Sequence, residues 1–165
     1  MSPIQKEVSA IRDSPQLDEV AVDYLYDALR AFRAGAFLGT VSLIGAASER
    51  LMIIVTEQLE GALIGVEQKN TFRNAIDSRN TRKAFEETIA TLQNKRNQLL
   101  KELKFDTDSK LHQLYHFIRL ARNEVGHPIG AKFQREETIS SLFSFARYAT
   151  ETYKVIACLK PDSLS

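Results

Sequence analysis

The chain has 165 residues, of which 44% are hydrophobic and 26% are charged, and its formal net charge is +1. This is the composition of an ordinary globular protein with enough residues to bury a core, and it is typical of neither a disordered nor a membrane-embedded chain. The near-zero net charge neither requires nor excludes a nucleic-acid partner. The single cysteine, Cys158, excludes an intramolecular disulfide and leaves no cysteine pair for a metal.

The N-terminal residues lack the apolar segment of a secretory signal, so we predict a cytoplasmic location. The first helix is predicted over residues 15–34. Ser14 and Pro15 form a good helix start, and Asp18 adds an acid to the expected first turn. Gly35 is expected to end the helix. Its apolar face is predicted to consist of Val20, Tyr24, Leu25 and Leu29.

The second helix is predicted over residues 36–60 and is expected to be the buried one. The uncharged run Ala34–Ser48 is too short to cross a membrane, which takes about 20 mostly apolar residues. We therefore predict a core helix and no membrane association. A strand at 37–44 is the main alternative, because FLGTVSLI alternates weakly, but the chain offers no partner strand.

Four further helices follow in the predicted order. The first is a short amphipathic helix around 67–77, and the second carries a seam with heptad spacing formed by Phe85, Ile89, Leu92, Arg96, Leu99 and Leu103. The third, over 108–126, has one stripe formed by Leu111, Tyr115, Ile118 and Arg122. The last, over 136–159, is expected to turn inward Ile139, Leu142, Phe143, Ala146, Tyr153 and Ile156.

Long amphipathic helices with short connections pack as an antiparallel bundle. The predicted fold is therefore all-α, an antiparallel bundle of about five to six helices. We predict a single helical domain over residues 14–160, with tails at 1–13 and 161–165.

Polar residues gather toward the end of the predicted helix 108–126. Four of them are spaced three or four residues apart and so share one helix face, namely His116, Arg119, Asn123 and His127. Arg122 falls on the apolar stripe, where a guanidinium loses hydration unless it meets an anion such as a phosphate. His127 precedes Pro128, which favours a non-helical backbone at that point. A histidine beside a fixed guanidinium suits acid–base chemistry on a phosphodiester.

The segment RNEVGH, from Arg122 to His127, resembles the R-N-x(3)-H signature of HEPN domains. These domains are helical bundles with the motif late in the chain, near the end of a long helix. Their early helix carries an acidic residue, which Glu49 in the GxxxE of Gly45–Glu49 resembles. The resemblance extends from the first predicted helix to the last and implies a HEPN-like bundle.

Many HEPN proteins are metal-independent endoribonucleases that act as dimers, with two motifs at the interface. The resemblance implies a homodimer without a cofactor that cleaves RNA, such as a toxin or defence protein with an antitoxin or regulatory partner. It implies that the ribose 2′-OH attacks and that His127 transfers protons. Arg122 would stabilise the charge on phosphorus, and Asn123 would orient the histidine or a phosphate oxygen. Glu49, Arg119 and His116 are supporting candidates.

Other interpretations of these residues stay open. His127 can act as a helix cap, and Arg122 can form an ion pair with Glu49. The protein is then a non-catalytic HEPN-like module for protein interaction, or a helical regulator that binds a transcription factor. The nine basic residues among four acidic ones between Lys69 and Lys104 fit either RNA phosphates or a solvated face paired with glutamates. His112 and His116 have no third ligand nearby, so no metal site is predicted.

Overall fold

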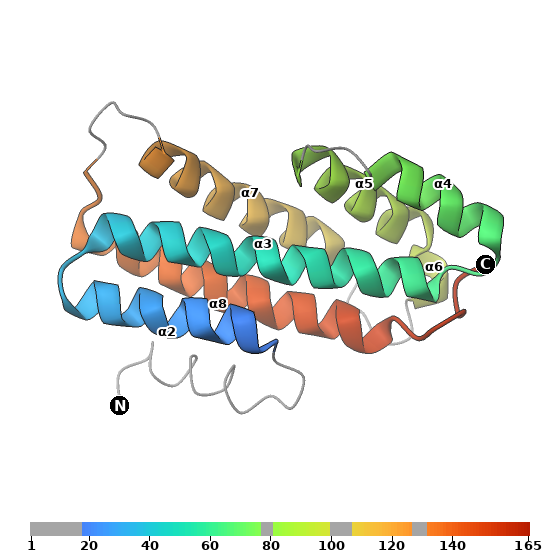
Figure 1. Cartoon of the computed structure of the whole chain (residues 1–165), viewed down its shortest axis with the longest axis horizontal. Coiled ribbons are helices and arrows are strands. Elements are labelled where there is room, and N and C mark those ends of the chain that lie inside the picture. Colours follow the sequence, from blue (N-terminus) through green and yellow to red (C-terminus); the bar gives the residue numbers. More distant parts are fainter. Residues whose placement is uncertain (1–17, 77–80, 100–106, 127–131) are drawn as a thin grey trace. The chain divides into compact units, whose positions relative to one another are not determined.

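The structure, a computed structural model, describes residues 18–76, 81–99, 107–126 and 132–165 (Figure 1). About 85% of this part is helical, and within it there is no strand, only an isolated bridge between Leu63 and Leu164. The predicted all-α class is confirmed. The described helices are α2 (Glu19–Arg33), α3 (Phe37–Ala62), α4 (Val66–Ile76), α5 (Thr81–Asn94), α6 (Arg96–Leu99), α7 (Thr107–Gly126) and α8 (Arg135–Cys158).

The chain divides into two compact units, which are described here one at a time. Unit 1 comprises Met1–Leu51 and Gln113–Thr150, and unit 2 comprises Met52–His112 and Glu151–Ser165. Helices α3, α7 and α8 are therefore each divided, with one part of the helix in unit 1 and the other in unit 2. The bounds predicted for a single domain stay a prediction.

Helix α2 begins later than predicted and ends where predicted. Asp18 is extended rather than helical, and its Oδ1 accepts a hydrogen bond from a backbone N–H of the first turn at 3.0 Å. Asp18 is thus the N-cap and not a first-turn residue, while the predicted start at Ser14–Pro15 lies outside the described residues. Gly35 has a φ of 74°, and the next N–H, that of Ala36, bonds to the carbonyl of Ala31 at 2.9 Å. This is the glycine-ended helix terminus that the sequence indicates.

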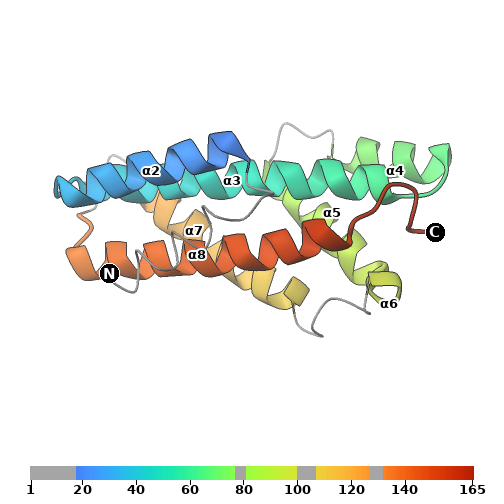
Figure 2. The same ribbon diagram turned by 90° about the horizontal axis from the view of Figure 1, so that it is seen from below.

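The buried face of α2 is made of smaller side chains than predicted. Ala21, Leu25 and Ala28 are buried, whereas Val20 and Tyr24 are 45% and 36% exposed. The prediction that Val20 and Tyr24 face the core is therefore wrong. Figures 1 and 2 show α2 running antiparallel beside the first half of α3. Small side chains permit this close approach, and a hydrophobicity pattern alone ranks alanine below valine and tyrosine.

The core of unit 1 contains Tyr148 of α8, which is fully buried. Its hydroxyl donates to the carbonyl of Ser48 on α3 at 3.1 Å, and its ring centroid lies 6.0 Å from that of Tyr115 on α7. One tyrosine thus joins three helices. Leu111, Tyr115 and Ile118 are all buried, so this much of the predicted α7 stripe is confirmed, while the side chain of Arg122 lies outside the described part.

Helix α8 buries polar side chains that its apolar pattern does not reveal. Leu142 and Ala146 are buried as predicted, but the other predicted inward residues are half-buried, namely Ile139, Phe143, Tyr153 and Ile156. Thr138 and Ser141 are buried, and their hydroxyls bond to the carbonyls four residues earlier at 2.9 and 3.0 Å. Because these hydroxyls are satisfied within their own helix, their burial costs little.

In unit 2, the second half of α3 packs against α5. The hydroxyls of Thr56 and Thr88 lie 2.9 Å apart and link the two helices inside the unit. Phe85 of α5 stacks on His112 at the start of α7, with ring centroids 5.7 Å apart and an interplanar angle of 19°. The histidine ring therefore has a packing role in unit 2.

The predicted heptad seam is not one continuous helix, because α5 ends before Lys95 and α6 begins after it. The seam residues Phe85, Ile89, Leu92 and Leu99 are buried as expected, and Leu103 lies outside the described residues. At the break, the N–H of Gln98 bonds to the carbonyl of Lys95 at 2.9 Å, the spacing of a tight turn. Both side chains bind Ser165, so the helix is interrupted where a distant segment docks.

Residues 161–165, set apart as a tail by the sequence pattern, return to the end of α3 (Figures 1 and 2). The N–H groups of Asp162, Ser163 and Leu164 donate to the carbonyls of Gly61 and Ala62 at 3.0, 2.9 and 2.8 Å. The last carbonyls of a helix lack partners within it, so this segment caps α3. Leu164 is 1% exposed and belongs to the core of unit 2.

Helix α3 is long and apolar enough to cross a membrane by length and composition. Half of its most apolar stretch is buried within the structure, and the core helix of a soluble protein meets the same criteria. The structure is thus compatible with the predicted buried helix of a soluble protein, and the predicted cytoplasmic location stays a prediction.

One ion pair of unit 1 joins the start of α2 to α3. Arg50 binds Asp18 with two hydrogen bonds, Nε to Oδ1 at 3.0 Å and Nη2 to Oδ2 at 2.7 Å. The Arg50 guanidinium lowers the pKa of the Asp18 carboxyl below its usual value of 3.8, and the backbone bond from Ala21 adds to this against the opposing effect of burial. Asp18 therefore serves as both helix cap and ion-pair partner.

We expect Asp18→Asn to lower the free energy of unfolding by no more than about 1 kcal/mol at neutral pH, because the pair is partly exposed and asparagine still caps the helix. The folded state holds the Asp18 pKa below its unfolded value. The stabilisation is therefore present above pH 3.8 and is lost as pH falls through the folded pKa. Urea unfolding of both proteins at neutral and acidic pH measures this. A difference that persists unchanged below that pKa would contradict the assignment.

Candidate functional site

Helix α7 carries the first two motif residues near its C-terminal end. It runs to Gly126, so Arg122 and Asn123 lie in its last two turns and His127 follows the helix directly in the chain. Asn123 is exposed. The side chain of Arg122 and the whole of His127 lie outside the described residues, so their mutual arrangement stays a prediction. The predicted late helix itself is present.

Arg119 is the described residue of this face with the most unusual surroundings. It is half-buried, and its Nε is buried with no hydrogen-bond partner in the part of the chain that the structure describes. Burial raises the pKa of the Tyr115 hydroxyl above its usual value, and the nearby Arg119 charge opposes part of that effect. A buried N–H without an acceptor is uncommon in proteins. The Nε of Arg119 is therefore a donor that the described surroundings leave unsatisfied.

The other two supporting candidates, His116 and Glu49, lie on α7 and α3. His116 lies one turn earlier on α7 and is half-buried. Glu49 lies on the unit 1 part of α3 and is also half-buried, beside Arg50 with its partner Asp18. The alternative pairing of Arg122 with Glu49 stays a prediction.

The basic stretch between Lys69 and Lys104 is largely engaged where it is described. Lys69 pairs with Asp162, Arg73 with Glu60, and Arg82 with Glu86 one turn along α5. The Nζ of Lys95 donates to the main-chain oxygen of Ser165. These ion pairs favour a solvated helix face whose charges are paired with carboxylates. They fit less well with a surface of unpaired cations that binds RNA phosphates.

No group of three or more histidine, cysteine, aspartate or glutamate side chains is placed to hold a metal among the described residues. The pair His112 and His116 gains no third ligand there. Of this pair, His112 stacks on Phe85.

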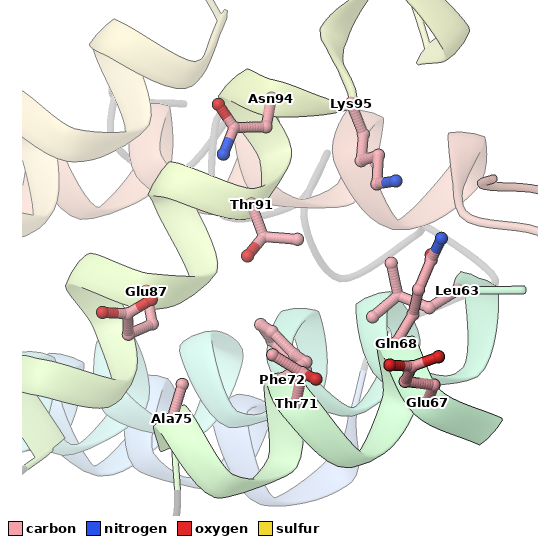
Figure 3. A pocket seen from close by; sticks show the side chains of 10 residues that line it. All are labelled: Leu63, Glu67, Gln68, Thr71, Phe72, Ala75, Glu87, Thr91, Asn94 and Lys95. Atoms are coloured by element: carbon pink, nitrogen blue, oxygen red, sulfur yellow. The ribbon is translucent and has the colours of Figure 1, made fainter. Parts of the chain in front are cut away.

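Sequence reasoning missed a cleft of about 480 Å³ in unit 2, between α4 and α5 (Figure 3). Its apolar lining comes from Leu63, Phe72 and Ala75, and Figure 3 places Glu67 and Glu87 at opposite ends of the lining. Neither glutamate has an ion-pair partner within the described ranges. The cleft residues come from different helices, so no local spacing in the sequence could have grouped them.

In comparisons with known proteins, the chain matches no family model, no curated protein and no solved structure. The interpretation of the site therefore depends on its own residues and on the resemblance of the RNEVGH segment.

Proposed function

We propose that the protein is a HEPN-like, metal-independent endoribonuclease, with Arg122, Asn123 and His127 as its catalytic residues. The observation that carries the proposal is the position of the motif. Arg122 and Asn123 occupy the last turns of a long, well-packed helix, and His127 is the first residue after it. Residues carried on a helix are held more precisely than residues on a loop.

The proposed reaction is an internal transfer at phosphorus. The ribose 2′-oxygen forms a bond to phosphorus as the bond to the 5′-oxygen breaks, which leaves a 2′,3′-cyclic phosphate and a 5′-OH. His127 exchanges the protons of these oxygens, and the Arg122 guanidinium stabilises the charge on the phosphoryl oxygens. Asn123 orients the histidine or a phosphoryl oxygen.

Arg119 supports this proposal. It lies one turn before Arg122 on α7, and its buried Nε has no partner in the described part of the chain. A second guanidinium beside the motif suits a neighbouring phosphate of an RNA strand, which has one negative charge per nucleotide. We place His116 and Glu49 as supporting residues at the edge of the same site.

The proposed assembly is a homodimer that brings two motifs together, since a lone site on one helix end would be open to water. In the cell, the proposed role is that of a toxin or defence protein controlled by an antitoxin or regulatory partner in the cytoplasm. Sedimentation that shows only monomer at micromolar concentration would contradict the dimer.

We expect purified protein to cleave RNA and to leave DNA of the same sequence intact, because DNA lacks the 2′-OH that attacks. Cleavage should continue in EDTA and should leave 2′,3′-cyclic phosphate ends. Gel analysis of a labelled RNA and its DNA counterpart, with end-group identification, makes the measurement. A dimeric preparation free of bound partners that leaves a mixed RNA pool intact would overturn the proposal.

The second candidate function is a non-catalytic helical module that binds a partner protein or regulates transcription. The observation that favours it is the engagement of the basic stretch, since Lys69, Arg73 and Arg82 already have carboxylate partners. Exposed apolar side chains on α2, Val20 and Tyr24, add a surface suited to protein contact. Failure of the RNA assay makes this the preferred function.

A further inference from the structure

At one end of unit 1, the turn between α2 and α3 meets the start of α8 (Figures 1 and 2). The rings of Phe32 and Phe37, on either side of this turn, have centroids 5.7 Å apart and an interplanar angle of 50°. The guanidinium carbon of Arg135 lies 5.7 Å from the centroid of the Phe32 ring. This is the distance of a cation–π contact, so the first residue of α8 packs directly on the aromatic pair.

The aromatic pair is open to solvent in part. Phe32 and Phe37 are half-buried, whereas Tyr148 in the core of the same unit is fully buried. Residues 34–36, which join the two rings, are small and exposed, and a Cβ placed on Gly35 would have open space around it. The turn therefore leaves room for a flat group from outside to approach the rings.

Three cations belong to the same end of unit 1. Arg33 ends α2, Lys132 precedes α8 and Arg135 begins it, and all three are exposed. None of them has an ion-pair partner within the described residues. An acid of the first turn of α8, Glu137, accepts a hydrogen bond from the N–H of Gln134 at 2.9 Å and so caps its own helix. The three cations differ in this from the paired basic residues of unit 2.

Exposed aromatic rings beside unpaired cations suit single-stranded nucleic acid, because bases stack on the rings and phosphates bind the cations. We call this surface the α2–α8 tip, and it consists of Phe32, Arg33, Phe37, Lys132 and Arg135. We infer that the α2–α8 tip binds a single-stranded segment of RNA, with bases stacked on its two rings and phosphates bound by its three cations. The choice of RNA as the ligand rests on the proposed cleavage activity.

The tip is within reach of the motif helix, and both belong to unit 1. Residues 127–131 separate Gly126, the last residue of α7, from Lys132. A segment of that length spans at most about 22 Å. A strand of a few nucleotides that lies at the end of α7 therefore extends to the tip. The tip would bind a part of the strand beyond the bond that is cut.

The first test measures binding without cleavage. The ligand is a fluorescein-labelled 2′-O-methyl RNA of about 12 nucleotides, within the length that one single-strand-binding fold covers. It has no free 2′-OH, so the proposed reaction cannot cut it. Fluorescence anisotropy of the full chain should show at least about tenfold weaker binding for the triple variant Arg33→Ala, Lys132→Ala, Arg135→Ala. The slope of log Kd against log salt concentration should fall by about 2, since each phosphate contact of a single strand contributes roughly 0.7.

A matched control removes the same charge from exposed positions outside the tip, as the triple variant Lys83→Ala, Arg147→Ala, Lys160→Ala. It should keep the affinity within about threefold of wild type, because only general charge attraction is reduced. Glu136→Gln removes an exposed carboxylate next to Arg135 in the chain and should tighten binding. Circular dichroism of each variant checks that it is folded.

The second test detects stacking. The chain has no tryptophan, so Phe37→Trp introduces a single reporter into the tip. A stacked base should quench its fluorescence when the oligomer binds. Tyr24→Trp places the same reporter on an exposed position of α2 outside the tip, and its fluorescence should not change. Equal quenching in both proteins would contradict stacking at the tip.

The outcomes separate the tip from the proposed cleavage. Equal affinity of the two triple variants for the oligomer would overturn the tip, even if the protein cuts RNA. Selective loss of binding in the tip variant would support the tip, even if no cleavage is found. Binding of phosphatidylserine vesicles without binding of the oligomer would make the tip a membrane surface and would overturn the inference.

Discussion

We expect His127→Ala and Arg122→Ala each to lower the rate of RNA cleavage by at least about 10²-fold, the usual loss for one general acid–base or charge-stabilising group. Removing the imidazole leaves no side chain to exchange protons with the 2′- and 5′-oxygens. Removing the guanidinium leaves the phosphoryl charge without its stabilising partner. Single-turnover cleavage of a labelled RNA measures both effects on the chemical step.

Two matched substitutions control for general damage. His112→Ala removes another histidine of α7, one that stacks on Phe85 in unit 2. Arg147→Ala removes an exposed arginine of α8. Both should keep wild-type cleavage within about threefold, well inside the effect expected for the motif. Equal losses in the controls and in the motif variants would attribute the effect to folding rather than to catalysis.

Melting temperature separates the catalytic role of Arg122 from the structural one. If Arg122 only forms an ion pair within the protein, Arg122→Ala lowers the melting temperature and there is no cleavage to lose. If it stabilises the reacting phosphate, cleavage falls while the melting temperature stays near that of wild type. An interface arginine can have both effects, so stability and cleavage must be measured on the same preparation.

The local features of the fold could be predicted from the sequence because they depend on neighbouring residues. Gly35 ends α2 as expected, since a residue with positive φ suits that helix terminus. The stripe Leu111, Tyr115 and Ile118 is buried as expected, since residues three or four apart share a helix face. The helix that carries the motif, α7, could be predicted for the same reason.

The contacts between distant residues could not be predicted in this way. Arg50 binds Asp18 across 32 positions, and Tyr148 bonds to Ser48 across 100. Periodicity assigns a residue to a face, but it does not say which helix lies opposite. The wrong prediction that Val20 and Tyr24 face the core has the same cause. Whether Ala21 and Ala28 form the buried face depends on how closely α3 approaches.

For the candidate site, too, the sequence predicted the local spacing of residues but not their contacts with distant ones. The spacing of His116, Arg119 and Asn123 placed them on one helix, and α7 contains all three. The buried, unpartnered Nε of Arg119 depends on neighbours that no spacing rule names. The docking of Leu164 at the end of α3 was missed for a related reason, since a short polar segment with one leucine gives no periodic signal.

Tyr148→Ala should lower the free energy of unfolding by about 3–5 kcal/mol, the usual cost of removing a buried aromatic ring. Tyr148 is fully buried, with 0% of its surface exposed to solvent. Its ring lies beside Tyr115 of α7, and its hydroxyl bonds to Ser48 of α3. The substitution therefore leaves a cavity where three helices meet in unit 1. Urea denaturation followed by circular dichroism measures the change.

Two further substitutions divide this cost between the ring and the hydroxyl. Tyr148→Phe keeps the ring and loses the hydroxyl that bonds to the Ser48 carbonyl, so it should cost about 1 kcal/mol. Tyr24→Ala removes a tyrosine that is 36% exposed on α2, and it should change stability by well under the cost of the core cavity. A Tyr148→Ala protein as stable as the Tyr24→Ala protein would contradict the packing of α8 against α3 and α7. If Tyr148→Phe were as damaging as Tyr148→Ala, the hydroxyl rather than the ring would hold these helices together, because loss of the hydroxyl is what the two substitutions share.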